Sequence, residues 1–207
     1  MLAPHCIAVL GLAYFREPGL PGTLDRIPLE YFIDAIDYAA RAPGIDPERI
    51  GMVSGSRGSE AALLVASMDA RIKSVVVATP SEVAWRGMTT AASAWTLRGE
   101  DVPALASNGN AAPTQTERFG AALDAVADWP RYRIPVERIN GPLLLISAEN
   151  DQIWPSKRMS DDIVQYLTQK KFRFPVRHLA YPTGHGFSQE LAPTIRQSVV
   201  DRFVETL

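Results

Sequence analysis

Residues 49–68 read RIGMVSGSRGSEAALLVASM, and this stretch decides the fold that we expect. Its beginning, RIGMVS at residues 49–54, is a short apolar run, which is typical of a strand buried in a parallel sheet. Residues 60–68 are rich in Ala and Leu and predict a helix. Since only a few residues separate the two elements, the chain must turn sharply between the strand and the helix.

The turn itself reads Ser54-Gly55-Ser56-Arg57-Gly58, a variant of the G-x-S-x-G nucleophile elbow in which Ser replaces the usual first glycine. At the central Ser56 we expect a strained backbone with small neighbours two residues away on either side, because strand and helix approach closely there. Ser56 would then lie at the helix N-terminus, where the backbone N–H of Arg57 and the helix dipole can stabilise an oxyanion. Taken alone, the motif also fits an ordinary glycine-rich turn.

Strands and helices are expected to alternate on both sides of this unit. Short apolar runs predict strands at residues 6–15, 73–79, 142–147 and 175–182. Apolar spacings of three and four residues predict a helix at residues 28–41, with Pro28 in its first turn, and further helices are expected at 156–169 and 192–206. Cys6, at the head of the first strand, is expected to be a small buried apolar residue. The alternation predicts an α/β fold with a mostly parallel sheet and helices on both faces.

Residues 81–138 interrupt this alternation and predict a lid-like insertion, because a long irregular segment in a compact domain is more often a lid or binding loop than a plain connection. The insertion holds three of the four Trp residues. Trp85 and Trp95, together with the later Trp154, could line a ligand groove, although large aromatic side chains belong more often to the core. Arg57 and Arg86 could meet an anionic group of a ligand, but solvated side chains are the favoured interpretation.

Composition narrows the class of protein. The sequence has 207 residues, is 46% hydrophobic and 21% charged, and carries a formal net charge of −2, which predicts one globular domain and offers no basic patch for nucleic acid. The single cysteine excludes an internal disulfide, and no His and Cys pattern has metal-ligand spacing. No apolar run is long enough to span a bilayer and no signal peptide is evident. We expect a soluble, cytoplasmic protein without metal or cofactor.

A general acid–base pair can be sought by chain order, since hydrolases with this elbow place the nucleophile first, then the acid, then the histidine. Asp151 follows the strand expected at residues 142–147, at the edge where open α/β sheets place their sites. Glu149 is the competing carboxylate. Asp151 is preferred because a residue further into the loop can reach across to a histidine, but spacing alone leaves the choice open.

His185 is the candidate general base. It lies in YPTGHGF, just after the last expected strand, and its flanking glycines free the loop to present the imidazole. His178 falls inside that strand, where a structural role is the better interpretation, and His5 lies near the N-terminus. His185 would take the proton from Ser56, and Asp151 would hold the imidazole in the correct tautomer.

Several stretches now resemble a known family. The sequence is similar to the C-terminal domain of the acyl-CoA thioesterase and bile acid-CoA:amino acid N-acyltransferase family over nearly its whole length. The most specific stretch is IPVERINGPLLLISAENDQIWPS at residues 134–156. The others are VLGLAYF, IPLEYFIDAIDY, SGSRGSEAAL, TPSEVAW, AWTLRGEDVP and YPTGHGF.

This resemblance implies an α/β-hydrolase fold, with Ser56, Asp151 and His185 as nucleophile, acid and base, and a fatty or similar acyl-CoA thioester as substrate. The three tryptophans named above could then line an acyl or pantetheine groove, and the two arginines could meet the phosphates of CoA. Members that transfer the acyl group to an amino acid resemble cysteine enzymes at the nucleophile, so Ser56 favours hydrolysis through an acyl-serine. The same triad is compatible with an acyl-CoA:amino acid N-acyltransferase or a carboxylesterase. A non-catalytic remnant is the third possibility.

The resemblance also implies missing parts. Family members carry a β-sandwich domain before the catalytic domain, and a further strand and a glycine-bearing loop that supplies a second oxyanion donor precede the strand at residues 6–15. We therefore expect residues 1–207 to form an incomplete, N-terminally truncated hydrolase domain. Either the strands at 6–15 and 49–54 pair directly, or the sheet is interrupted between them. Loss of one oxyanion donor would lower turnover about 100- to 1,000-fold.

Overall fold

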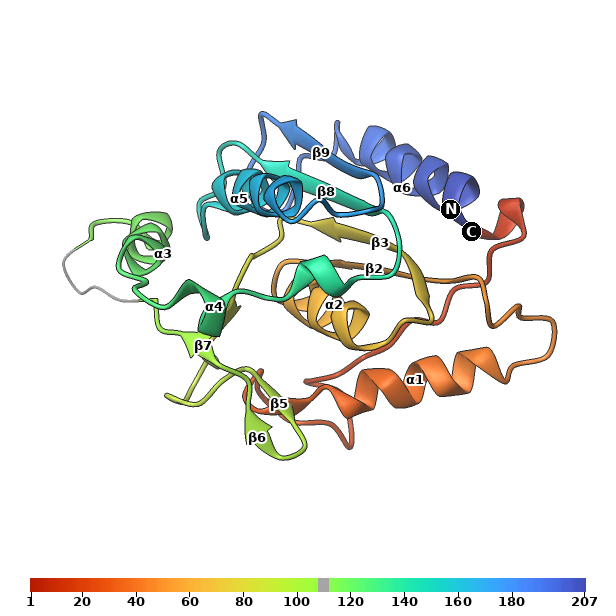
Figure 1. Cartoon of the computed structure of the whole chain (residues 1–207), viewed down its shortest axis with the longest axis horizontal. Coiled ribbons are helices and arrows are strands. Elements are labelled where there is room, and N and C mark those ends of the chain that lie inside the picture. The colour runs from red at the N-terminus through yellow and green to blue at the C-terminus, as the bar shows by residue number, and fades with distance from the viewer. Residues whose placement is uncertain (108–111) are drawn as a thin grey trace.

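A four-stranded parallel sheet forms the centre of the protein, as the computed structural model of residues 1–107 and 112–207 shows (Figure 1). The strand order is β2-β3-β8-β9, and each neighbouring pair is parallel. The four strands are β2 (Ile50–Gly55), β3 (Ile72–Ala78), β8 (Leu143–Ala148) and β9 (Val176–Tyr181). The predicted α/β fold with a mostly parallel sheet is confirmed, and these four strands lie where the apolar runs predicted them.

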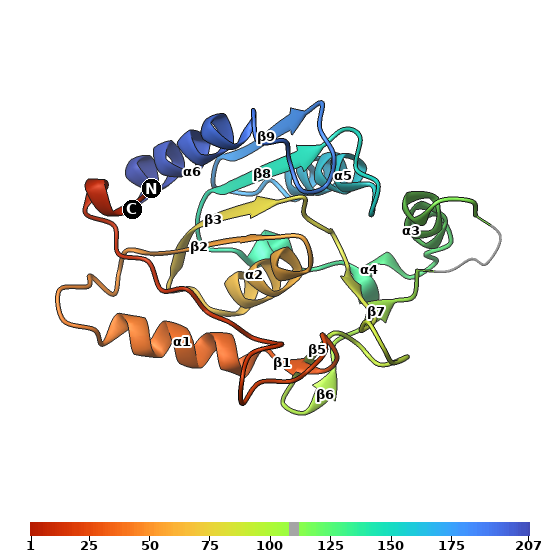
Figure 2. The same cartoon turned by 180° about the vertical axis from the view of Figure 1, so that it is seen from behind.

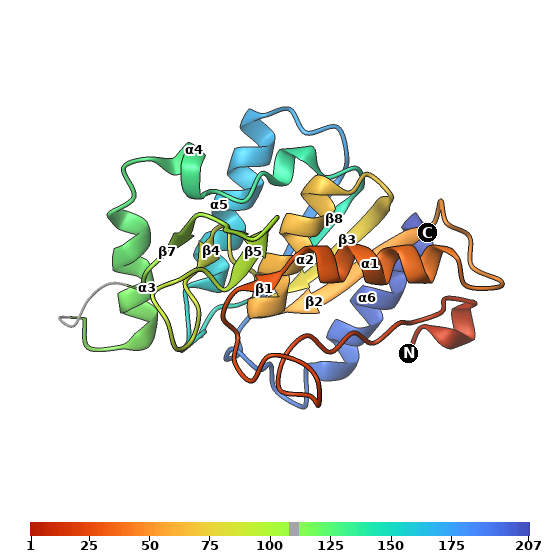
Figure 3. The ribbon, with the colours of Figure 1, turned by 90° about the horizontal axis from the view of Figure 1, so that it is seen from below.

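Helices cover both faces of this sheet, as predicted (Figure 3). They are α1 (Glu30–Ala40), α2 (Arg57–Met68), α5 (Ser156–Gln169) and α6 (Ala192–Thr206). Successive side chains of a strand point to opposite faces. Val75 and Val77 of β3 therefore pack in the cluster that contains α1, α2 and α5, whereas Val76 packs against Phe203 of α6.

Two helix starts differ from the prediction. Pro28 does not open α1 but lies in the short strand β1 (Ile27–Pro28), so the helix begins two residues later, at Glu30. Helix α2 begins at Arg57 rather than at residue 60. The turn after β2 therefore consists of Ser56 alone, which is shorter than the sequence suggested.

The strand predicted at residues 6–15 is wrong. This segment follows a 3-10 helix, η1 (Ala3–His5), and runs past β2 without pairing with any strand that the structure describes (Figure 2). Val9 and Leu10 are 64% and 49% exposed, and Cys6 is also exposed, so its expected burial is wrong too. Apolar composition is not enough for a strand, because the backbone groups need a hydrogen-bonded neighbour.

Direct pairing of that segment with the strand before the elbow, one of the two alternatives that the sequence left open, is therefore absent as well. Within the described part of the chain β2 pairs only with β3, and Val53 on β2 is 47% exposed. The four-stranded sheet is therefore continuous and ends at β2, which is an edge strand.

The segment at residues 81–138 lies beyond the carboxyl ends of the parallel strands (Figure 1). Its short strands form two small sheets: β5 and β6 complete a sheet with β1, which lies outside the segment, and β4 pairs with β7. The segment also contains two short helices. Its elements are β4 (Ala84–Trp85), β5 (Trp95–Leu97), β6 (Glu100–Asp101), β7 (Ala104–Leu105), α3 (Gln115–Asp124), α4 (Trp129–Tyr132) and the 3-10 helix η2 (Val136–Arg138). Residues 108–111 of this segment lie outside the described residues.

The two ends of this insertion are joined by a buried ion pair. Glu82, 1% exposed, lies 3.0 Å from the guanidinium of Arg133, which also stacks on the rings of Trp129 and Tyr166. Burial raises the pKa of Glu82 to about 7, the nearby charge of Asp162 adds to the rise, and Arg133 opposes it. The insertion is therefore closed at its base by this pair, and the carboxyl group of Glu82 has a pKa of about 7.

Replacement of Glu82 by Gln should remove a pH dependence of stability. Because burial raises the folded-state pKa of Glu82 from 4.5 to about 7, the folded protein binds more protons than the unfolded chain between these values. The free energy of unfolding of the wild type should therefore fall, relative to Glu82→Gln, by about 1.4 kcal/mol per pH unit as pH rises from 5 to 6.5. Urea unfolding of both proteins at several pH values measures the difference; parallel curves would contradict it.

Gly141, just before β8, should not tolerate a side chain. A Cβ at this position would lie 2.1 Å from the carbonyl oxygen of Lys73, and backbone atoms cannot move aside as a flexible side chain can. Gly141→Ala should lower the free energy of unfolding by about 2–3 kcal/mol. Gly120→Ala in helix α3 is the matched control, because a Cβ there meets no atom within 4 Å and should be neutral or stabilising. Equal urea midpoints for the two variants would contradict the prediction.

None of the helices in the part of the chain that the structure describes is both long and apolar enough to cross a membrane.

Candidate active site

Ser56 occupies the sharp turn between β2 and α2. Its φ of 52° and ψ of −130° form a conformation that non-glycine residues rarely adopt, as the strained elbow predicted. The amide of Ser56 donates to the carbonyl of Ala78 on β3, which holds the turn against the sheet. A Cβ on Gly58 would lie 2.3 Å from Oγ of Ser54, so the need for a small residue there is confirmed.

His185 lies beside Ser56, although 129 positions separate them in the sequence. Its Nε2 is 2.7 Å from Oγ of Ser56, and its Nδ1 is 2.9 Å from both carboxylate oxygens of Asp151. The side chain of His185 is mostly buried. The structure thus brings the three residues selected from the sequence into one continuous hydrogen-bonded chain.

Asp151 is held as an ionised acceptor. Oδ2 accepts from the hydroxyl of Ser156 at 2.6 Å, and Oδ1 accepts from the amides of Ile153 and Trp154. Burial alone would raise the pKa of Asp151, but the hydrogen bonds from His185, Ser156 and Ile153 outweigh it and lower that pKa below its usual value. Asp151 is therefore a carboxylate at neutral pH and can stabilise an imidazolium.

Sequence reasoning missed the residues that orient this pair. Oε1 of Gln152 accepts a hydrogen bond from the backbone N–H of His185 at 3.1 Å. The ring of Trp154 packs edge-on against the imidazole of His185, with ring centroids 5.5 Å apart. Thr116 of α3 donates to the carbonyl of Asp151. No motif marks these residues, although Gln152, Trp154 and Ser156 all fall in the stretch that carries the family resemblance.

The alternative candidates lie elsewhere. Glu149 is exposed, and its amide donates to the carbonyl of Tyr181. His178 lies in β9, where Nε2 is 2.7 Å from Oγ of Ser147 and Nδ1 is 3.0 Å from Asp161, so its structural role agrees with the prediction. Burial lowers the pKa of His178, and Asp161 opposes that change. His5 is exposed in η1.

The backbone N–H of Arg57 is placed where an oxyanion donor is needed. Arg57 is the first residue of α2, and the amides of the first helical turn have no intrahelical acceptor. In the part of the chain that the structure describes, this amide donates to no backbone carbonyl outside the helix. It can therefore point, together with the positive end of the helix dipole, at a negative oxygen on a carbonyl carbon attacked by Ser56.

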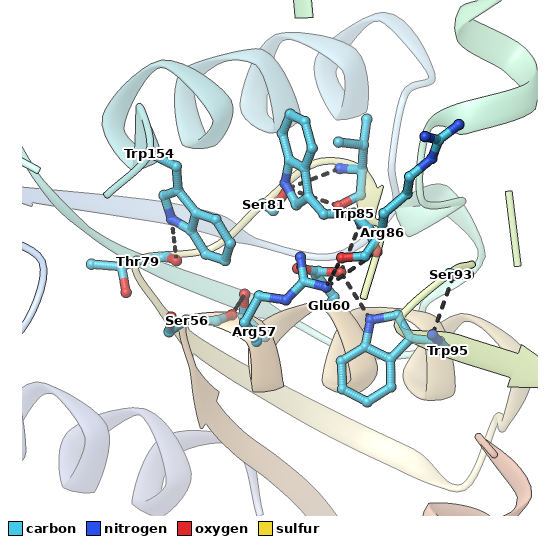
Figure 4. A network of polar contacts seen from close by, with 12 residues as sticks. Ser56, Arg57, Glu60, Thr79, Ser81, Trp85, Arg86, Ser93, Trp95 and Trp154 are labelled. Carbon is cyan, nitrogen blue, oxygen red and sulfur yellow. Dashed lines mark hydrogen bonds and ion pairs between the residues drawn. The ribbon is translucent and has the colours of Figure 1, made fainter. Parts of the chain in front are cut away.

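The side chain of Arg57 corrects the expected solvated arginine. One guanidinium nitrogen, Nη2, donates to the carbonyls of Trp85 and Arg86, and the other, Nη1, lies 2.8 Å from Glu60 (Figure 4). Only 19% of the side chain is exposed. Arg86 itself is exposed, in agreement with its prediction.

The three tryptophans are buried, which agrees with the favoured core interpretation and leaves no indole surface for an acyl groove. Trp85, Trp95 and Trp154 are each at most 1% exposed. Each indole N–H has a partner: Trp85 donates to Ser81, Trp95 to Glu60 and Trp154 to the carbonyl of Thr79 (Figure 4).

In the described part of the chain, no group of three or more His, Cys, Asp or Glu side chains has an arrangement that could hold a metal ion.

Comparison with known sequences identifies one family. The family model described as BAAT / Acyl-CoA thioester hydrolase C terminal matches residues 27–205. Human acyl-coenzyme A thioesterase 1 is 29% identical over 205 residues, which cover 96% of this chain and 47% of that protein. Acyl-coenzyme A amino acid N-acyltransferase 1 of Mus musculus is 31% identical, over 93% of this chain and 45% of that protein. The chain therefore spans about half the length of these relatives.

Comparison with solved structures identifies the fold. A dienelactone hydrolase from Anabaena variabilis superposes with a TM-score of 0.51 and 16% identity, over 86% of this chain and 59% of that structure. At this identity the likeness speaks for the architecture alone. It agrees with the α/β-hydrolase fold expected from the elbow.

Proposed function

This chain belongs to the BAAT / acyl-CoA thioester hydrolase C-terminal family, and from that premise we propose that it is a serine thioesterase that hydrolyses acyl-CoA to free acid and CoA. The observation that carries the proposal is the hydrogen-bonded chain from Ser56 through His185 to Asp151 at the carboxyl edge of the sheet. Thioesterases of the family at 29% identity support the thioester as substrate.

Each residue has one role in acylation. Oγ of Ser56 attacks the thioester carbonyl carbon while Nε2 of His185 takes the hydroxyl proton. The carbonyl oxygen becomes an oxyanion opposite the amide of Arg57, and the Asp151 carboxylate stabilises the imidazolium. The carbon–sulfur bond then breaks, sulfur leaves with the electron pair, and the imidazolium returns the proton, so CoA departs as a thiol.

Deacylation repeats these steps with water. His185 takes a proton from a water molecule while the water oxygen attacks the carbonyl carbon of the acyl-serine ester. The ester bond to Oγ of Ser56 then breaks, and the imidazolium of His185 returns the proton to Oγ. The products are the free acid and the unmodified serine. The insertion at residues 81–138 would exclude other solvent, and its position beyond the strand ends supports its role as a lid.

The deciding test is a substrate panel with the purified chain. Free CoA release from palmitoyl-CoA is measured with and without glycine, beside hydrolysis of a p-nitrophenyl ester. Hydrolysis of the thioester without an acceptor supports the thioesterase. Formation of acyl-glycine would instead support an N-acyltransferase, in keeping with the 31% identical relative, and ester hydrolysis alone would indicate a carboxylesterase.

No turnover of any substrate by a folded sample would point to a non-catalytic remnant.

A reducing, cytoplasmic setting is part of the same proposal. It is supported by the single cysteine of the sequence, Cys6, which is free and exposed.

A further inference from the structure

Glu60, on the first turn of α2, is a fully buried carboxylate. Side chains of this kind are almost never fully buried unless they are paired. Its Oε2 accepts from the amide of Trp85 at 3.0 Å and from the indole of Trp95 at 2.8 Å (Figure 4). Its Oε1 lies 2.8 Å from the guanidinium of Arg57 but makes no directed hydrogen bond, so charge alone pairs it.

These contacts connect the elbow to the insertion. Arg57 directly follows the proposed nucleophile, and its second guanidinium nitrogen donates to the carbonyls of Trp85 and Arg86. Trp85 belongs to β4 and Trp95 to β5, which lie in different small sheets. One ion pair on the first turn of α2 therefore holds two separate strands of the insertion in place.

Stability alone gives little reason for this ion pair. Removal of two charges from water costs about as much as their attraction returns, and apolar residues of similar volume often replace buried ion pairs without loss. Such pairs can instead select one arrangement among several. The ion pair here involves Arg57, whose backbone N–H is the proposed oxyanion donor. The arrangement that the pair selects is therefore one that affects the reaction.

We propose that Glu60 is a positioning residue: by holding the Arg57 side chain against β4, it fixes the Ser56–Arg57 peptide so that the Arg57 amide points at the oxyanion. Since this amide has a task only in a serine hydrolase, the proposal rests on the proposed function. It deepens that function by making the docked insertion a requirement for transition-state stabilisation.

Glu60→Gln is the principal test. The amide oxygen still accepts from Trp85 and Trp95, but the charge opposite Arg57 is gone. We expect kcat for palmitoyl-CoA to fall about 10- to 100-fold with KM within twofold, because a misdirected donor weakens binding of the transition state and not of the substrate. Asp69→Asn removes another carboxylate paired with an arginine, at the opposite end of α2 from the elbow and outside the insertion, and should leave kcat within twofold.

The pH profile gives a readout that a purely structural role would not move. Burial raises the pKa of Glu60 to about 7, and Arg57 opposes the rise. The other ionisable group facing Glu60 is Tyr14 of the N-terminal segment, whose pKa burial raises, so it stays neutral. Strands β2, β4 and β5 carry no charged residue, and the other charged residues on elements packed against α2 are Lys73 of β3 and Glu137 and Arg138 of η2.

Protonation of Glu60 should therefore lower kcat of the wild type by the same 10- to 100-fold as pH falls through about 7. Glu60→Gln has no ionisable group at this position and should lack this decrease. Asp69→Asn should keep it, because Asp69 does not touch the elbow.

Four outcomes decide the proposal. Selective loss of kcat in Glu60→Gln, together with loss of the decrease in kcat near pH 7, supports it. Unchanged kcat in Glu60→Gln beside an active wild type, or a decrease near pH 7 that persists in this variant, overturns it while the proposed function stands. If circular dichroism shows that Glu60→Gln is unfolded, Arg57→Lys decides in its place, since lysine keeps the charge but loses the fork that reaches both carbonyls. If the wild type turns over no substrate, the rate of Ser56 labelling by a fluorophosphonate replaces kcat, and absence of labelling overturns both proposals.

Discussion

Ser56→Ala should abolish acyl-CoA hydrolysis, with turnover lower than that of the wild type by about 10,000-fold or more. The exchange removes only the hydroxyl group of Ser56, and the oxygen of this group, Oγ, lies 2.7 Å from Nε2 of His185. Without it no acyl-serine can form, and direct attack by water would have to proceed from a position that Oγ now occupies. Release of free CoA from palmitoyl-CoA measures the loss, and mass spectrometry of the intact protein should find the acyl adduct in the wild type alone.

Ser198→Ala on α6 is the matched control for this experiment. Its hydroxyl donates to the carbonyl of Thr194 within the same helix, so its removal should leave turnover within twofold. Retention of more than a hundredth of the wild-type rate by a folded Ser56→Ala variant would show that the serine is not the nucleophile.

Asp151→Asn is expected to lower kcat about 1,000- to 10,000-fold. An amide can present a donor where Nδ1 of His185 needs an acceptor, so Nε2 would carry the proton and could no longer take one from Ser56. The carboxylate also accepts from Ser156 and from the amides of Ile153 and Trp154, so its geometry is held by groups that the exchange leaves in place. Steady-state kinetics with palmitoyl-CoA measures the effect.

Glu149→Gln separates the two carboxylates that the sequence left as alternatives. Glu149 is exposed, and the carboxylate that accepts from Nδ1 of His185 is that of Asp151. Its substitution should leave kcat within twofold. A larger loss in Glu149→Gln than in Asp151→Asn would assign the acid to Glu149.

Much of the fold could be predicted because local sequence and tertiary environment agree there. The helices at 156–169 and 192–206 match α5 and α6 to the residue, and the strands around the elbow lie within a few positions of their predicted ends. The segment at residues 6–15 failed for a physical reason. An apolar run predicts burial, but a strand also needs a neighbouring strand with unpaired backbone groups. The sequence of the segment does not show whether such a strand lies beside it in the fold.

The candidate site divides in the same way. Ser56, Asp151 and His185 could be selected by motif and chain order, and their catalytic roles stay predictions. Glu60 could not be selected, because a glutamate on an Ala-rich helix is usually solvated and only the insertion packed over it removes it from water.

The sequence by itself determined the alternation of strands and helices, the elbow motif and the chain order of the proposed nucleophile, acid and base, since these depend on neighbours within a few positions or on chain order. Only the tertiary structure decided which residues surround them. The support of Asp151 by Ser156, the burial of the tryptophans and the ion pair between Arg57 and Glu60 arise from contacts between distant segments. Burial turns an ordinary carboxylate into a positioned charge, and burial is a property of the folded chain.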